Sequence, residues 1–392
     1  MKALRNYLDK IKPHFQEGGK LHAFHSLFDG FETFLYVPNT TSKSGTHIHD
    51  SADSKRLMSF VVIALIPALL FGMYNVGYQH YLHAVGTLGS FWEMFIYGFL
   101  AVLPKIIVSY GVGLGIEFII AQWKKEEIQE GFLVSGILIP MIVPIDCPLW
   151  MLAVATAFAV VFAKEIFGGT GMNVFNVALV TRAFLFFAYP TKMSGDAVWV
   201  SSDSIFGLGK TVDGLTVATP LGEAATAAAD KFPIFNMDMV TGLIPGSIAE
   251  TSVIAILIGA AILLITGIAS WKIMLSVFVG GAFMGWVFNV VGPDTAMAHM
   301  PWYEHLALGG FCFGAVFMAT DPVTSSRTET GKYIFGFLIG VMAIVIRVLN
   351  PGYPEGMMLA ILIMNIIAPL IDYYVVDANI NRRAKRALNS NN

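Results

Sequence analysis

Long apolar stretches separated by short polar ones fill most of the chain after residue 56. A helix needs about 20 predominantly apolar residues to cross the hydrocarbon core of a bilayer. Ten stretches approach that length: residues 57–77, 93–122, 131–145, 149–166, 174–190, 252–270, 271–292, 305–320, 332–349 and 356–376. The pattern predicts an all-α integral membrane protein with about ten transmembrane helices.

Three of these stretches have unusual lengths. The second, residues 93–122, is long and contains Pro104 and Lys105, but its counterpart in the second half of the chain favours one helix over two. The third and the eighth are short, which predicts helices that are broken or buried inside the protein.

The five stretches before the long polar interval and the five after it resemble two copies of one unit. In each half a short span ends in a proline-containing turn, at 144–148 and at 320–322. A hinge rich in Gly, Pro and Asn then precedes the last span, at 167–173 and at 350–356. Because five is an odd number, the second copy would be inverted in the membrane. Paired interrupted spans predict two inverted five-helix repeats with a site at their interface.

The predicted organisation has five parts: an N-terminal segment 1–56, a first membrane repeat 57–190, a loop region 191–251, a second repeat 252–377 and a tail 378–392. Most of the 24 Lys and Arg residues fall on one side of the membrane if the N-terminus lies inside. Such an excess marks the cytoplasmic side. We expect both termini in the cytoplasm and the loop region on the opposite, periplasmic side.

Composition agrees with a membrane protein and excludes several other classes. Hydrophobic residues make up 56% of the 392 residues and charged residues 13%, whereas an ordinary soluble domain is about 25% charged. The formal net charge of -3 gives no basic surface for nucleic acid, so no nucleic-acid partner is expected. The two cysteines, Cys147 and Cys312, are too few to hold an iron–sulfur cluster without help from another chain.

Ionisable residues inside apolar spans are costly and therefore mark candidate functional sites. Glu117 lies deep in the second span, and Asp321 and Asp372 lie close to prolines in the second half, which makes them candidates for an ion pathway. Acidic residues nearer the span ends would merely cap helices. Gly111 and Gly115 are spaced four residues apart, a spacing that predicts tight helix packing.

Known nucleotide and metal motifs are incomplete. The run Gly207–Thr211 imitates the tail of a phosphate-binding loop, but Ser204 stands where that motif requires a glycine. The chain has no His-Glu-x-x-His sequence and no dinucleotide-binding glycine fingerprint. We expect nicotinamide cofactors to bind elsewhere than on this chain.

The loop region contains the stretch Asp213-Gly-Leu-Thr-Val-Ala-Thr-Pro220. Its small residues favour an extended peptide that a modifying enzyme can reach, and Asp213 would help to orient it. Loops of this composition are usually only loops. The chain also offers competing hydroxyls at Thr226, Thr241 and Thr251. Alone, the stretch does not define a function.

Six stretches together resemble the B subunits of Na⁺-translocating NADH:quinone reductases, and the resemblance covers essentially the whole chain. They are 130–132, 163–171, 182–190, 244–247, 319–322 and 353–360. The resemblance implies FMN attached by a phosphoester to the last Thr of a Ser-Gly-Ala-Thr-like motif. That motif reads Thr216-Val-Ala-Thr219 here, so FMN would be carried by Thr219, with Asp213, Thr216 and Ala218 completing the recognition sequence.

The resemblance also implies other ligands and partners. It implies a noncovalent riboflavin, a quinone site near Gly113 and Glu117, and carboxylates for Na⁺ uptake at Asp29, Glu117, Asp321 and Asp372, with the Na⁺ ligands themselves unassigned. Partners would be the other subunits of the reductase, quinone, and the flavin transferase that modifies the loop. The chain would lie in a bacterial inner membrane.

The resulting hypothesis is a subunit that relays electrons from FMN through riboflavin to quinone while the complex exports Na⁺. The flavins would supply the redox chemistry and the protein would orient them. Two alternatives stay open. One is the homologous D subunit of an ion-translocating ferredoxin:NAD oxidoreductase, against which the polar N-terminal segment argues. The other is a solute channel resembling urea transporters, which an inverted repeat alone would allow.

Overall fold

The computed structural model describes residues 2–15, 54–124, 131–228 and 235–390, with isolated positions between 19 and 46. Within these residues the fold is helical, and its one β feature is an isolated bridge between Ile205 and Leu208. Several helices are apolar and long enough to span a bilayer. The prediction of an all-α membrane protein is confirmed. Asp29 lies outside the described residues.

Each of the ten predicted spans contains a helix. The long ones are α3 (Ser54–His80), α4 (Phe91–Lys124), α6 (Leu149–Ala159, extended by a π-helical turn Val160–Lys164 and a 3-10 turn Glu165–Phe167), α11 (Trp271–Val291), α15 (Glu329–Leu349) and α16 (Met357–Ser390). Shorter apolar helices are α5 (Phe132–Met141), α7 (Val177–Ala188) and α10 (Val253–Ile265). The second span is one helix, as expected.

The eighth span is broken, as its length predicts. It consists of α13 (Trp302–Ala307), a break, and α14 (Phe311–Phe313), which continues as a π-helical segment Gly314–Met318. Small helices outside the spans are α1 (Lys2–Ile11), α8 (Pro220–Thr226), α9 (Asp238–Thr241) and α12 (Ala296–His299).

The two halves have inverted orientations. One cavity is lined by residues at the beginnings of α3, α5 and α7 and by residues at or just after the ends of α10 and the segment 314–318. On the opposite side, Ile142 at the end of α5 and the side chain of Arg182 from α7 meet residues that precede α10 and α16. We call these the cavity side and the loop side. Corresponding helices of the two halves therefore run in opposite directions, as an odd number of spans per half requires.

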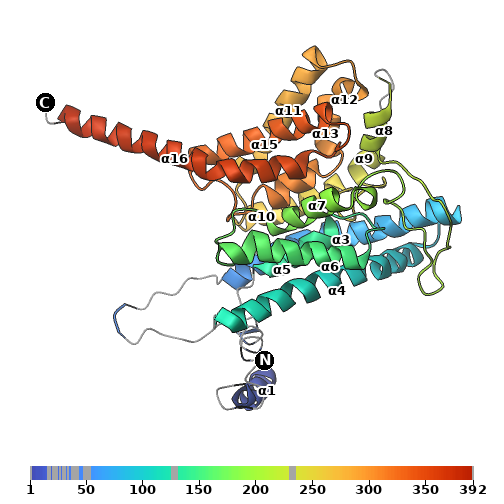
Figure 1. The fold of residues 1–392 in the computed structure, drawn as a ribbon, viewed down its shortest axis with the longest axis horizontal. Helices are drawn as coiled ribbons and strands as arrows, with labels where there is room; N and C mark the ends of the chain where they lie inside the picture. Colours follow the sequence, from blue (N-terminus) through green and yellow to red (C-terminus); the bar gives the residue numbers. More distant parts are fainter. Residues whose placement is uncertain are drawn as a thin grey trace.

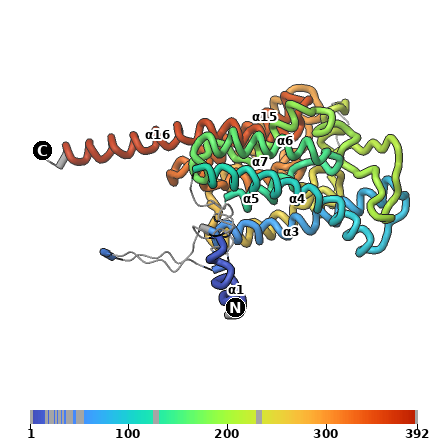
Figure 2. Tube along the Cα trace, turned by 60° about the horizontal axis from the view of Figure 1, so that its bottom comes forward, coloured from blue at the N-terminus to red at the C-terminus, as the bar shows by residue number. Residues whose placement is uncertain are grey.

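Figures 1 and 2 show the helices lying side by side, with the loop of residues 191–219 at one end of the bundle. The last part of α16 projects from the other end. Helix α16 runs without interruption through residue 390, so most of the tail expected from residue 378 onward continues the last span as a helix.

Glycines bring the helix backbones into direct contact. A Cβ at Gly340 of α15 would overlap the carbonyl oxygen of Val277 in α11, and one at Gly280 of α11 would overlap that of Phe337 in α15. The backbones of α3 and α4 meet in the same way at Gly98. In a membrane, where helix association depends on close packing, small residues at such contacts are common.

The prediction of tight packing at Gly111 and Gly115 is wrong, because a Cβ at either position would meet open space. The close contact on this part of α4 is at Gly113, where a Cβ would overlap the ring of Phe132 in α5. The spacing of small residues indicates a helix face, but it does not say which face is covered.

Replacing Gly340 with Val should separate α11 from α15 and lower the free energy of unfolding by about 1–3 kcal/mol, the usual cost of overpacking. Gly111→Val is the matched control, since its side chain would enter open space. Thermal unfolding of the two purified variants in detergent measures the difference. Equal melting temperatures would contradict the packing described.

Candidate functional site

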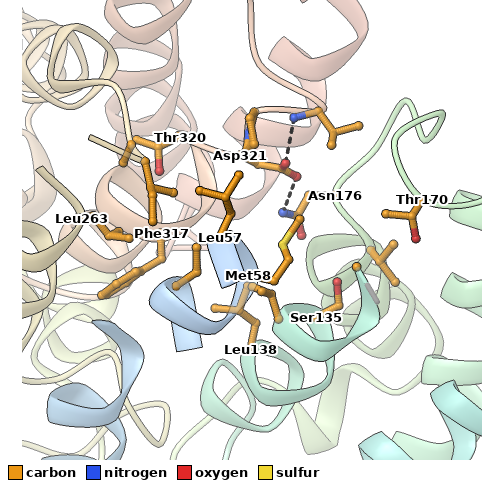
Figure 3. Close-up of a pocket in the computed structure, with 18 of the residues that line it drawn as sticks. Leu57, Met58, Ser135, Leu138, Thr170, Asn176, Leu263, Phe317, Thr320 and Asp321 are labelled. Carbon is orange, nitrogen blue, oxygen red and sulfur yellow. Dashed lines mark hydrogen bonds between the residues drawn. The ribbon is translucent and has the colours of Figure 1, made fainter. Parts of the chain in front are cut away.

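On the cavity side, the interface between the repeats encloses a cavity of about 370 Å³. Figure 3 shows its walls: Leu57 and Met58 of α3, Ser135 and Leu138 of α5, and Leu263 and Phe317 of the second repeat. The walls are mainly apolar and carry a few polar groups, which is typical of sites for small organic ligands and cofactors.

Asp321 and Asn176 link the two repeats at this cavity (Figure 3). The Asn176 side chain donates to the Asp321 carboxylate at 3.1 Å, and its own oxygen caps α7 by accepting from the amide of Ala178. The same carboxylate accepts from the Val323 amide at 3.0 Å and from the Thr324 hydroxyl at 3.2 Å. Asp321, a predicted ion-pathway residue, therefore holds the turn after the broken span to the hinge before α7.

The predicted quinone residues Gly113 and Glu117 are buried within the protein, and neither of them lines this cavity. Gly113 packs under Phe132. Glu117 forms an ion pair with Lys164, and Lys164 lines the cavity. The quinone assignment stays a prediction, and the geometry connects Glu117 to the cavity rather than to an open surface.

Asp372, the last of the predicted ion-pathway residues, lies apart from the other two. Its carboxylate accepts from the hydroxyls of Ser326 and Thr328, both at 2.6 Å, and from the amide of Arg327 at 2.8 Å. It thereby fixes the chain just before α15. Asp321, Glu117 and Asp372 thus do not form one cluster, and no metal-binding group of three side chains is found among the described residues.

On the loop side, Thr219 follows an extended segment without regular structure and becomes the N-cap of α8. Its hydroxyl oxygen accepts from the Gly222 amide at 3.0 Å. Asp213 and Thr216 are exposed, and Ala218 and Thr219 are half-buried. A modifying enzyme would find this peptide accessible and extended.

The competing threonines lie within or beside helices or are buried. Thr226 is exposed, but it lies within α8 and its hydroxyl donates back to the helix carbonyls. Thr241 lies at the end of α9, and Thr251 is buried and accepts a hydrogen bond from Asn75. The local structure therefore favours Thr219.

A small cleft under Thr219 reaches the interface between the repeats. Its lining includes Ser247, Glu250, Gly309 and Glu355. Ser247 and Glu250 precede α10, Gly309 lies in the break before α14, and Glu355 lies in the hinge before α16. The loop-side site is therefore built from the entry points of three spans of the second repeat.

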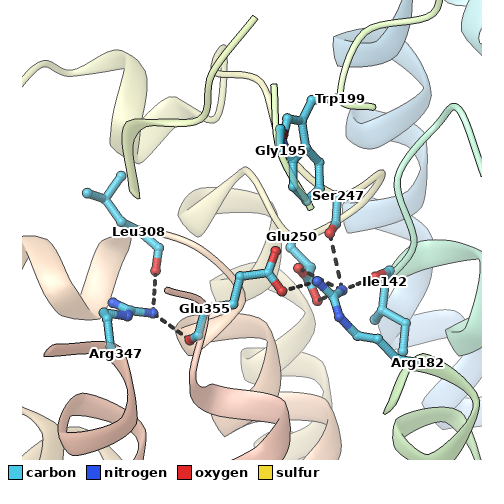
Figure 4. A network of polar contacts seen from close by, with 9 residues as sticks. All are labelled: Ile142, Arg182, Gly195, Trp199, Ser247, Glu250, Leu308, Arg347 and Glu355. Carbon is cyan, nitrogen blue, oxygen red and sulfur yellow. Dashed lines mark hydrogen bonds and ion pairs between the residues drawn. The ribbon is translucent and has the colours of Figure 1, made fainter. Parts of the chain in front are cut away.

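The guanidinium of Arg182 ties these elements to the first repeat (Figure 4). It donates to the carbonyl of Ile142 at the end of α5 and forms an ion pair with Glu355. It also reaches Ser247 at 3.2 Å and Glu250 at 3.4 Å. Arg182 and Glu250 are both buried, and burial raises the pKa of Glu250, an effect that Arg182 opposes.

Arg347 anchors the broken span of the second repeat in a similar way (Figure 4). It donates to the carbonyls of His305 at 2.6 Å, Leu308 at 3.2 Å and Glu355 at 3.1 Å. These carbonyls lie at the end of α13 and in the hinge, where helix geometry leaves them without intrahelical partners.

The two junctions are related by the repeat. On the cavity side, Asn176 at the start of α7, after the hinge of the first repeat, meets Asp321 in the turn after the broken span of the second. On the loop side, Glu355 from the hinge of the second repeat meets Arg182, which caps the end of α5 in the first. This junction on the loop side was not predicted from the sequence. The charged residue Arg182 inside an apolar span was the signal that could have indicated it.

Arg182→Gln should destabilise the protein by about 3–5 kcal/mol, because it leaves buried carboxylates without their counter-charge. Lys192→Gln is the matched control. It breaks the ion pair between Lys192 and Asp146, whose side chains are 42% and 32% exposed. The loss of this pair should lower the free energy of unfolding by less than about 1 kcal/mol. Thermal unfolding compares the two, and a control loss as large as that of Arg182→Gln would contradict the role given to the junction.

Comparisons with known proteins place the chain in a family. The model of the NQR2, RnfD, RnfE family matches residues 41–381. A protein of Chromohalobacter salexigens is 47% identical over 98% of this chain and 96% of its own length. Proteins of Pseudomonas aeruginosa and Azotobacter vinelandii are each 45% identical over 98% of this chain and 99% of their own length. All three relatives are named as the B subunit of a Na(+)-translocating NADH-quinone reductase. The chain therefore belongs to the NQR2, RnfD, RnfE family.

Proposed function

We propose that this chain is the B-type membrane subunit of a Na⁺-translocating NADH:quinone reductase. The observation that carries the proposal is the match at 45–47% identity, over nearly the whole of both chains, to relatives with that name. Their alignments cover 98% of this chain, whereas the model of the wider family matches only residues 41–381. Agreement beyond that range favours the B subunit over the D subunit of a ferredoxin-dependent complex.

In this proposal Thr219 carries FMN through a phosphoester. The accessible peptide before it, the half-buried hydroxyl and the cleft beneath it fit an attached group that packs against the interface of the repeats. Asp213, Thr216 and Ala218 form the peptide that a flavin transferase reads. Glu250 and Glu355 set the charge beneath the attached group.

The cavity on the opposite side is the place for the noncovalent flavin. A flat, largely apolar ring system with polar edges suits a cavity with apolar walls and amide, hydroxyl and charged groups at separate points. Asn173, Asn176, Ser135 and Thr170 supply such groups. When bound, the flavins would supply the electron-transfer chemistry of this chain. The chain's own residues hold the two flavins on opposite sides of one repeat interface.

The excess of Lys and Arg gives the orientation in the bacterial inner membrane. We place both termini and the cavity side in the cytoplasm, and Thr219 on the periplasmic side. The other subunits of the reductase would oxidise NADH, and quinone and Na⁺ would be the further partners. Asp321, Glu117 and Asp372 remain candidates for the ion pathway.

Thr219→Ala should abolish covalent flavin on this chain, because Thr219 is the last Thr of the motif Thr216-Val-Ala-Thr219 that the flavin transferase would modify. The measurement is in-gel flavin fluorescence of the denatured polypeptide after co-expression with its flavin transferase. Thr226→Ala is the matched control and should keep full fluorescence. Fluorescence that persists in Thr219→Ala would move the attachment site. No fluorescence in the wild type, with the transferase active on another substrate, would overturn the covalent assignment.

Ser135→Phe should fill the cavity and displace the noncovalent flavin without changing the covalent one. Val154→Phe, on the exposed surface of α6, is the control of equal bulk. Acid precipitation of the purified complex releases noncovalent flavin, which chromatography then quantifies per chain. An unchanged amount in a folded Ser135→Phe complex would show that the flavin binds elsewhere.

A further inference from the structure

Lys164 occupies an unusual position at the wall of the cavity. It is the last residue of the π-helical turn Val160–Lys164, which continues α6 with a wider helical geometry just before the glycine hinge. Single π-helical turns inside helices are frequent at functional sites. The side chain is buried, and it lines the cavity between the repeats.

The ammonium group of Lys164 has donors to spare. An ammonium carries three N–H donors, and its one polar contact among the described residues is the carboxylate of Glu117. The second oxygen of that carboxylate, Oε2, is buried and has no hydrogen-bond partner within the part of the chain that the structure describes. A buried charge with unused donors is costly unless another group satisfies it.

The charges around the cavity are arranged at two separate points. Among the described residues that line it, Lys164 is the only basic one and Asp321 the only acidic one. Asp321 is already satisfied by Asn176, Val323 and Thr324. Lys164 is therefore the charged group of the cavity wall that remains available to a ligand.

A purely structural role explains the Lys164–Glu117 pair poorly. Lys124 at the end of α4 and Glu165 after α6 already form an ion pair at 3.6 Å between the same two segments, with Lys124 partly exposed. A buried pair contributes little net stability, because its desolvation offsets most of the attraction. A second pair, buried and incompletely hydrogen-bonded, is better explained by a ligand that completes it.

We propose that Lys164 is a ligand-binding residue of the cavity, which donates to a carbonyl oxygen on the edge of the noncovalent flavin, and that Glu117 is the positioning residue that holds its ammonium in place. This inference rests on the proposed function, since it requires a flavin in the cavity. The ammonium strengthens binding and favours the reduced flavin, whose ring system carries more negative charge.

The proposal gives Glu117 a different role from direct contact with quinone. Its carboxylate acts on the cavity through Lys164, so a change at Glu117 alters the noncovalent flavin first. Any effect of Glu117 on quinone reduction would then follow from the altered flavin.

The test compares Lys164→Gln with Lys164→Arg, which keeps the charge, and with Lys124→Gln, which removes a charge from the neighbouring surface pair. The purified complex is depleted of noncovalent flavin and titrated with riboflavin, whose fluorescence falls on binding. Lys164→Gln should weaken binding about tenfold to a hundredfold, the loss typical of one hydrogen bond to a charged group. Lys164→Arg and Lys124→Gln should stay close to the wild type.

A redox titration of the bound riboflavin gives a second readout that a structural role would not move. Its midpoint potential should fall in Lys164→Gln and stay near the wild-type value in Lys164→Arg. Wild-type affinity and potential in Lys164→Gln would overturn the role of Lys164 and leave the cavity assignment intact. A wild-type complex that neither contains nor binds riboflavin would instead overturn the cavity assignment itself.

Discussion

A buried guanidinium must be surrounded by acceptors, and in this protein that requirement joins the two halves of the fold. Arg182 satisfies the carbonyl of Ile142 just after the end of α5 and pairs with Glu250 and Glu355 from the second repeat. None of these groups can leave without exposing an unpaired charge to an apolar interior. The end of α5, the hinge before α16 and the chain before α10 are therefore fixed relative to one another, and the cleft under Thr219 is built on them.

The inverted repeat produces a related junction on the other side of the molecule, where Asn176 and Asp321 bound a cavity. The same design thus yields two sites at one interface, one open to the loop that carries Thr219 and one near the beginnings of α3, α5 and α7. An electron carrier needs its redox groups held at fixed positions across the membrane. The Asn176–Asp321 and Arg182–Glu355 junctions provide such positions without a large polar interior.

Hydropathy and repeat symmetry were sufficient to predict the helices and their inverted order, because a bilayer fixes span length and an odd number of spans fixes direction. The partners of buried charges were not predictable in this way. Glu355 is 173 residues from Arg182 in the sequence, and no spacing rule connects them. Glu117 could be singled out as a costly intramembrane carboxylate, but its partner Lys164 follows from the packing of α4 against the end of α6. At Gly111 and Gly115 the spacing correctly indicated one face of a helix, but the described part of this chain packs nothing against that face.

The central claim, that the loop side carries a covalent flavin while the cavity side does not, is tested most directly by mass spectrometry of the wild-type chain. Cleavage after Lys210 and Lys231 releases one peptide that contains Thr219 together with Thr211, Thr216 and Thr226. The account predicts that this peptide carries the mass of one FMN joined as a phosphoester, and that fragmentation places it on Thr219. An unmodified peptide from a complex whose chain fluoresces after denaturation, or FMN on another residue, would contradict it.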